Sequence, residues 1–145
     1  MTPAKLEKTG QSDFFLASLN QILNRAHALF VLADSIEWSV FDAEFGGLYV
    51  DRVGRPGLPT RLMVGIHYLK HAFNVSDEEA VLGFLENPYW QYFCGMEHFV
   101  HVCPFDRSSM TRWRSRIGAE KMERLLKETF ETARRAKLIS PSETK

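Results

Sequence analysis

Four arginines fall within residues 107–118, and serine and threonine side chains stand between them. No acid interrupts this segment, whereas residues 76–106 contain six acids and no lysine or arginine. Arginine can pair bidentately with guanine O6 and N7, and its neighbours can neutralise phosphates. Short hydroxyl side chains allow a helix backbone to lie close to base edges. These residue types at this spacing therefore predict contact with a DNA duplex.

A helical wheel separates the two kinds of side chain in this segment. Met110, Trp113 and Ile117 fall within one narrow arc, so we expect them to face the core. The other side presents the predicted DNA contacts. For base edges these are Ser108, Ser109, Thr111 and Arg112, with Ser115 on the same face. For phosphates they are Arg107, Arg114 and Arg116, joined by Arg61 and Lys70 from an earlier segment.

The same arginines have a plainer interpretation. They would be solvated on an exposed helix, paired within the fold with the acids of residues 76–106. The chain carries 18 basic and 18 acidic residues and a formal net charge of zero, which argues against a uniformly basic surface. Composition alone does not decide between a DNA surface and internal ion pairs.

Two other groups of residues contain metal-ligand types. Two thiols and two imidazoles lie within ten residues, in Cys94, His98, His101 and Cys103, but their spacing lacks the paired ligand turns of structural zinc sites. His67 and His71 lie one helical turn apart with no evident third ligand, which favours a polar helix face that touches phosphate. We therefore predict no metal site.

We assign no catalytic residue to this chain. The sequence contains no glycine-rich phosphate loop and no nucleophile elbow. A group of closely spaced acids, Asp34, Glu37, Asp42 and Glu44, is typical of an acidic helix exterior.

Apolar residues recur with helical period along nearly the whole chain, which predicts an all-α fold of several helices. The first helix is expected to start at Ser12 or Asp13 and to continue towards Leu32. A second short helix is expected around Trp38, Phe41 and Phe45, ending at Gly46-Gly47. After Pro59, a third is expected to bury the stripe formed by Leu62, Ile66, Leu69 and Phe73.

The second half of the chain carries further start and stop signals. Ser76 and Glu79 form a capping box for a helix over 77–86, and its predicted buried side consists of Val81, Leu82 and Leu85. A short segment over 88–94 and the 108–117 helix complete a helix-turn-helix-like trihelical unit, although the loop over 96–105 is longer than a tight turn.

A last amphipathic helix is expected over 120–137. Its predicted inner face is formed by Met122, Leu125, Leu126, Thr129 and Ala133. We therefore divide the chain into a helical DNA-binding domain, residues 1–118, and a C-terminal helix with linker, residues 119–145.

Composition places the chain among cytoplasmic globular proteins. It is 45% hydrophobic and 12% aromatic, has two cysteines, and contains no apolar run of the roughly 20 residues needed to span a membrane.

The arrangement of motifs resembles the N-terminal domain of the IS-five family of DDE transposases, which are bacterial insertion-sequence enzymes. The resemblance extends in order from about Trp38 to Leu138. It rests on the motifs Gly54–Pro56, Arg61–Met63, His67–His71, Ser76–Glu79, Glu86–Gly95, Pro104–Asp106 and Ser108–Gly118. Cys103 departs from the aliphatic residue expected before Pro104.

The resemblance implies that this region recognises the terminal inverted repeats of double-stranded transposon DNA. In the family, a following ribonuclease-H-like domain carries an Asp-Asp-Glu triad that binds two divalent metals such as Mg²⁺. The first triad aspartate is expected beyond the segment at residues 139–142, so we expect this chain to be inactive alone and to hold no cofactor. Two alternatives stay open: a helical interaction module, which pairs with a second copy or a separately encoded catalytic half, and a non-functional transposase remnant.

Overall fold

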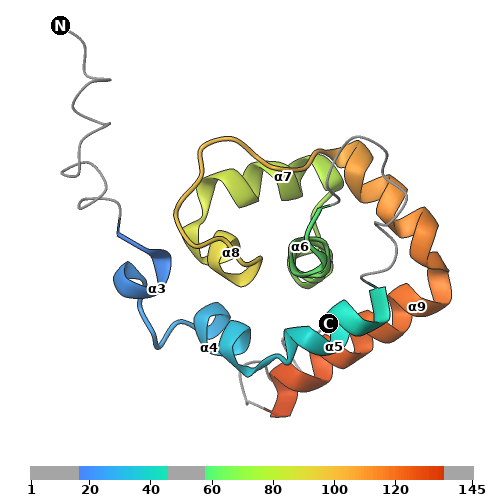
Figure 1. Cartoon of the computed structure of the whole chain (residues 1–145), viewed down its shortest axis with the longest axis horizontal. Coiled ribbons are helices and arrows are strands. Elements are labelled where there is room, and N and C mark those ends of the chain that lie inside the picture. Colours follow the sequence, from blue (N-terminus) through green and yellow to red (C-terminus); the bar gives the residue numbers. More distant parts are fainter. Residues whose placement is uncertain (1–16, 46–57, 136–145) are drawn as a thin grey trace, which may run out of the picture.

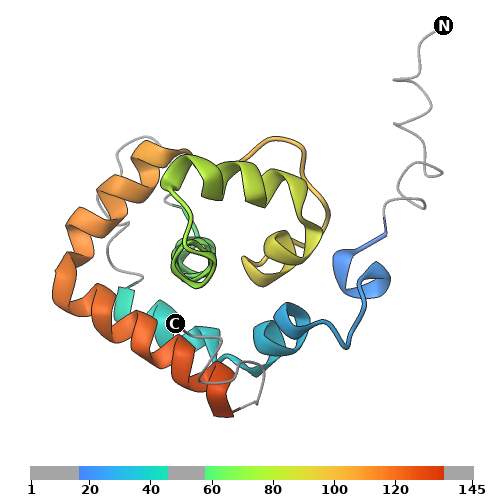
Figure 2. The ribbon, with the colours of Figure 1, turned by 180° about the vertical axis from the view of Figure 1, so that it is seen from behind.

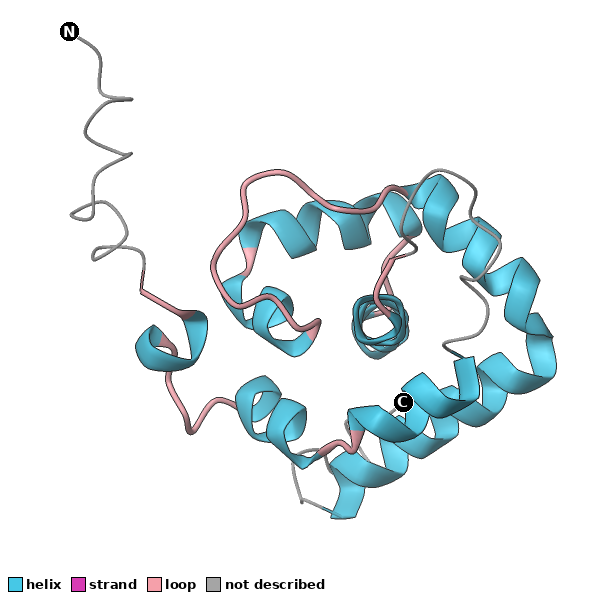
Figure 3. Cartoon of the chain, viewed as in Figure 1, coloured by secondary structure: helices cyan, strands magenta, loops and turns pink. Residues whose placement is uncertain are grey.

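The computed structural model describes residues 17–45 and 58–135. Within these ranges the regular structure is entirely helical (Figure 3). The helices are α3 (Leu19–Ile22), α4 (Ala28–Ser35), α5 (Trp38–Phe45), α6 (Thr60–Phe73), α7 (Asp77–Glu86), α8 (Pro88–Phe93) and α9 (Arg107–Arg135). The all-α prediction is confirmed.

Helix α6 lies at the centre of the fold. Opposite views show it end-on within a ring formed by α4, α5, α7, α8 and α9 (Figures 1 and 2). Every residue from Leu62 to Leu69 is buried, and a helix buried on all sides must be apolar or carry paired polar groups. The predicted stripe is confirmed for Leu62, Ile66 and Leu69, whereas Phe73 at the end of the helix is 52% exposed.

The expected continuous first helix is wrong in its middle, because the chain leaves the helical conformation between α3 and α4. Leu23 is extended, and the Asn24 and His27 side chains accept hydrogen bonds from backbone amides two residues further on. The Asn24 amide donates to the Tyr89 hydroxyl at 2.9 Å, and the His27 and Tyr89 rings stack 3.8 Å apart. Local capping and contact with α8 therefore override the apolar period. The predicted start near residue 12 lies outside the described residues.

Helix α7 begins as predicted. The Ser76 hydroxyl accepts a hydrogen bond from the Glu79 amide, and the Glu79 carboxylate accepts one from the Ser76 amide. Each contact satisfies a backbone donor that the helix start leaves open. This capping box fixes where α7 starts, and the preceding turn is tight because Asn74 is left-handed, with φ 55°.

The predicted buried side of α7 is wrong. Its core residues are Ala80 and Phe84, whereas the expected trio Val81, Leu82 and Leu85 is less buried and Leu82 is 56% exposed. A Cβ atom at Gly83 would lie 2.6 Å from the Trp90 ring, so α7 packs closely on α8 along its glycine side. That close approach rotates the helix away from the orientation expected from its aliphatic residues.

A buried amide holds the loop between α8 and α9. Gln91 is fully buried; its Nε2 atom donates to the Phe84 and Val100 carbonyls, and its Oε1 atom accepts from the Val100 amide at 2.8 Å. The Phe105 ring packs edge-on against Phe84, with ring centroids 5.2 Å apart. These contacts hold the loop in place and thereby fix the position at which α9 begins.

Helix α9 contains both helices expected from the sequence, joined at Gly118. This glycine has φ 82° and ψ 161°, outside the helical region, which agrees with the predicted glycine stop. The second half buries Leu125, Thr129 and Ala133 of the predicted inner face. Its predicted end near residue 137 lies outside the described residues.

We predict that Gln91→Ala lowers the free energy of unfolding by about 2–4 kcal/mol, because it leaves the buried Phe84 carbonyl and two partly buried backbone groups of Val100 without these partners. Asn20→Ala, at an exposed polar residue of α3, is the control and should change it by less than about 0.5 kcal/mol. Urea unfolding followed by circular dichroism measures both. Equal stability of the two variants would show that the Gln91 contacts contribute nothing.

Candidate functional site

The first half of α9 presents two different faces, as predicted. Met110, Trp113 and Ile117 are buried, with exposed fractions of 6% or less. The Trp113 ring stacks on His67 of α6 at 4.9 Å and meets the Phe45 ring of α5 edge-on at 5.9 Å. These three side chains anchor the helix to the core.

The outer face of this half-helix is polar and exposed. Its exposed residues are Arg107, Ser108, Thr111, Arg112, Ser115 and Arg116. Arg112 donates to the Ser108 hydroxyl one turn earlier at 3.2 Å, and it makes no ion pair within the described residues. The guanidinium of Arg112 is therefore available to an incoming ligand.

Asp106 closes the start of α9. Its Oδ1 atom accepts hydrogen bonds from the Ser108 hydroxyl at 2.6 Å and from the amide and hydroxyl of Ser109. These hydrogen bonds lower the pKa of Asp106 to about 2, and the bond from Ser108 has the largest effect. The hydroxyls of Ser108 and Ser109 are thus engaged in capping the helix.

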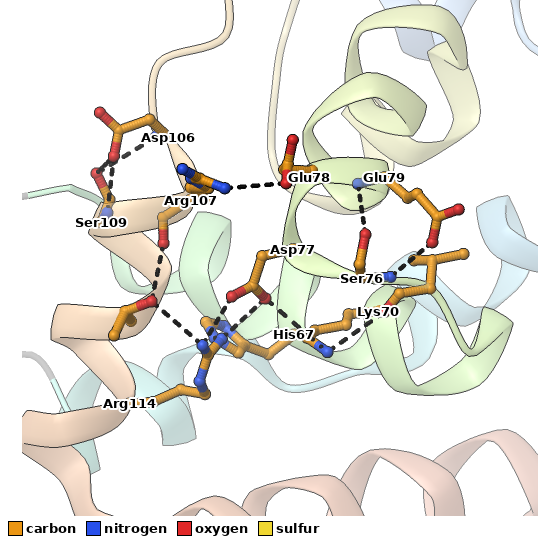
Figure 4. Close-up of polar contacts among 12 residues, drawn as sticks. His67, Lys70, Ser76, Asp77, Glu78, Glu79, Asp106, Arg107, Ser109 and Arg114 are labelled. Atoms are coloured by element: carbon orange, nitrogen blue, oxygen red, sulfur yellow. Dashed lines mark hydrogen bonds and ion pairs between the residues drawn. The ribbon is translucent and has the colours of Figure 1, made fainter.

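Arg114 points inward to a junction of three helices (Figure 4). Its two terminal nitrogens donate to the two carboxylate oxygens of Asp77 on α7, at 3.0 and 2.8 Å, and Nη1 also donates to His67 Nε2 at 3.2 Å. Burial raises the pKa of Asp77, but the hydrogen bonds and charge of Arg114 outweigh it and hold that pKa below its usual value. Arg114 therefore fastens α9 to α6 and α7.

His67 completes the junction from inside the core. Its Nδ1 atom lies 2.7 Å from the Met63 carbonyl and donates to it, since Nε2 is the acceptor for Arg114. Burial is the main cause that lowers the pKa of His67 to about 4, so the ring is neutral at neutral pH. A neutral imidazole with both nitrogens paired can be fully buried at little cost.

The acidic start of α7 also borders the outer face of α9. Arg107 Nη1 lies 2.9 Å from Glu78 Oε1, in an ion pair whose partners are both well exposed. A shallow groove of about 480 Å³ separates the two helix starts and is lined by Ser76, Asp77, Glu78, Arg107, Ser108, Thr111 and Arg112. Ser108, Thr111 and Arg112, which are predicted to contact bases, thus share a groove with the carboxylates of Asp77 and Glu78. The sequence indicates these acids only as capping or neutralising groups. Two capped helix starts of opposite charge were the available signal for that pairing.

The two predicted phosphate contacts from α6 lie near opposite ends of that helix. Lys70 is beside the junction, with Nζ 3.9 Å from Asp77 Oδ1. Arg61 lies nine residues earlier, about 14 Å away along the axis. Its guanidinium lies 4.5 Å over the Trp38 ring and donates to the Tyr92 and Phe93 carbonyls at the end of α8. The structure therefore does not bring Arg61 together with the arginines of α9.

Cysteine and histidine side chains at the end of α8 and in the loop before α9 do not form a metal site. These are Cys94, His98, His101 and Cys103. Cys94 is buried, and burial raises its thiol pKa, whereas Cys103 is half-buried and His98 and His101 are exposed. Among residues 17–45 and 58–135, no three His, Cys, Asp or Glu side chains are arranged to hold a metal ion. No helix in the same ranges is long and apolar enough to cross a membrane.

Comparison with known proteins gives a family match and a relative. Residues 17–116, more than half of the chain, match the family model described as Transposase domain (DUF772). A protein of Rhizobium meliloti, described as the uncharacterized protein ORF8 in nfe locus, is 51% identical over 133 residues. The aligned region covers 92% of this chain and 63% of that relative. No solved structure gives a significant match.

The depressed pKa of His67 predicts a dependence of stability on pH. Between about 4 and the ordinary value of 6.5, the unfolded chain binds a proton at this ring that the folded chain does not bind. The free energy of unfolding should hold its full value above pH 6.5. It should fall as the pH drops towards 4, by up to ~1.4 kcal/mol per unit.

His67→Gln retains an amide oxygen that can accept from Arg114 but cannot titrate, so it should reduce this slope. A smaller slope should remain, because the pKa of His71 is also lowered, mainly by burial. His101→Gln, at an exposed ring, is the matched control and should leave the slope unchanged. Urea unfolding at several pH values between about 4.5 and 7.5 measures all three proteins. A slope as steep in the His67→Gln variant as in the unaltered chain would contradict the assignment.

Proposed function

This chain belongs to the family of transposase domains described as DUF772, and from that membership we propose that it binds the terminal inverted repeats of an insertion sequence during DNA transposition. The observation that carries the proposal is the outer face of α9. Arg112 lies there among Ser108, Thr111 and Ser115, exposed and without an ion pair in the described chain. A rigidly anchored helix that exposes arginine and hydroxyl groups suits the major groove of DNA.

The contacts of each arginine refine its proposed role. Arg112 would face base edges, while Arg107 and Arg116 flank it and would bind phosphates. Arg114 is held by Asp77 and His67, so we assign it to positioning the helix. Arg61 is assigned to α8, whose last carbonyls accept its hydrogen bonds.

Helices α7 and α8 and the first half of α9 form the trihelical unit of this proposal. The loop between α8 and α9 replaces the tight turn of a standard helix-turn-helix, and Gln91 supplies the rigidity that a short turn would otherwise give. From the resemblance to IS-five transposases we propose that the DDE catalytic domain, with its metal ions and the chemical steps, belongs to a region that follows this one. We expect the protein to act in the bacterial cytoplasm, where its DNA substrate lies.

Self-association through the end of α9 receives less support. The apolar side of that half-helix is buried within the same chain, where Phe130 packs against Tyr68 of α6 at 5.2 Å. Its remaining surface is largely charged and exposed. The DNA-binding proposal is therefore preferred to dimerisation through this helix.

The proposal predicts that the full chain binds a duplex of its element's inverted repeat more tightly than a scrambled duplex, with affinity that falls steeply as salt rises. Arg112→Ala should lower discrimination between the two by about 1–3 kcal/mol, because it removes a base contact. Arg134→Ala, which removes an exposed arginine near the far end of α9, is the matched control. Fluorescence anisotropy measures the affinities, and equal binding of the two duplexes by the unaltered chain would refute sequence recognition.

A further inference from the structure

The three acids at the start of α7 have different partners. Asp77 is held by Arg114, and Glu79 closes the capping box with Ser76. Glu78 has one partner, the exposed Arg107 side chain. The contacts of Asp77 and Glu79 thus have a role in holding the fold. The contact of Glu78 does not give it such a role.

The Glu78–Arg107 ion pair is open to exchange. Its side chains are 72% and 68% exposed, and exposed pairs of this kind contribute little to stability. Arg107 can therefore leave Glu78 for a phosphate at small cost. Glu78 stays on α7, where it lines the same groove as Arg107, Ser108, Thr111 and Arg112.

A duplex docked on α9 would bring either phosphates or base edges close to this carboxylate. An ionised carboxylate only accepts hydrogen bonds, so a phosphate at this position is repelled. In the major groove, an exocyclic amino group of cytosine or adenine is a donor that matches it. The structure thus gives Glu78 one favourable and one unfavourable kind of neighbour on DNA.

We propose that Glu78 is a specificity-determining residue of this DNA surface: its carboxylate accepts a hydrogen bond from a base amino group in the matched duplex and repels phosphates in unmatched ones. This inference rests on the proposed function, because it requires that α9 bind DNA. It also gives a physical reason for acids beside a DNA-binding helix in a chain of zero net charge. They weaken binding to every duplex that lacks the matching donor.

The test compares the unaltered full chain with Glu78→Gln, on the inverted-repeat duplex and on a scrambled duplex at about 0.1 M salt. Loss of the charge should strengthen binding to the scrambled duplex by about threefold to tenfold. Binding to the inverted repeat should improve less or weaken, so the ratio of the two affinities falls at least about threefold. Thermal unfolding of the variant should stay within about 5 °C of that of the unaltered chain, since the lost ion pair is exposed and one charge in the first turn of α7 contributes at most about 1 kcal/mol.

Glu86→Gln is the matched control, because Glu86 is an exposed carboxylate on the same helix. It lies eight residues further on, about 12 Å along the axis and beyond the Debye length of about 10 Å. The affinities of Glu86→Gln for the inverted-repeat duplex and for the scrambled duplex should remain within about twofold of those of the unaltered chain. An equal response of the two variants would reduce the effect of Glu78 to general charge and overturn the proposal.

A scan that replaces each base pair of the inverted repeat in turn locates the contact. The unaltered chain should show a preference at one position with a cytosine or adenine, and Glu78→Gln should reduce that preference most. If the unaltered chain discriminates between the duplexes and Glu78→Gln leaves the affinity ratio and the base preferences unchanged, the role of Glu78 is contradicted. The proposed function then still stands. An unaltered chain that binds neither duplex, or both equally, contradicts the proposed function and this inference with it.

Discussion

The guanidinium group of Arg114 joins three helices at one point. It pairs bidentately with Asp77 of α7 and donates to His67 of α6, which is itself held by the Met63 carbonyl. Because α6 is buried on all sides, this junction connects the first half of α9 to the centre of the fold. The orientation of the outer face of α9 depends on that connection together with the buried Met110, Trp113 and Ile117.

One helix can hold the fold together and still expose arginines because its faces are divided by geometry. Arg114 lies one residue after Trp113 and binds Asp77 and His67 in the junction. Arg112 lies one residue before Trp113 and is exposed to solvent. The arginine segment therefore divides between residues paired within the fold and a residue left for the proposed DNA surface. Internal ion pairs account for Arg114 and Arg107, and an open polar surface remains around Arg112. The count of arginines says little about binding until each partner is known.

Features that depend on neighbouring residues were predictable from the sequence. The Ser76 capping box, the proline-bounded start of α8 and the break at Gly118 follow from local backbone chemistry, and the core side of α9 follows from helical period. The gap between α3 and α4 was not predictable, because Tyr89 is 65 residues from the Asn24 amide that it binds. The rotation of α7 and the partners of Arg61 and Arg114 likewise arise from packing between distant segments. Sequence pattern places a side chain on a face, but only tertiary contact shows what that face meets.

A double-mutant cycle between Asp77 and Arg114 tests the central claim most directly. Asp77→Asn, Arg114→Gln and the double variant are compared with the unaltered chain by urea unfolding at neutral pH, and the interaction free energy is taken from the departure from additivity. The junction predicts a coupling of about 1–3 kcal/mol, as expected for a partly buried, bidentate, charged hydrogen-bonded pair. A coupling below about 0.3 kcal/mol would show that the pair does not hold α9 to α7.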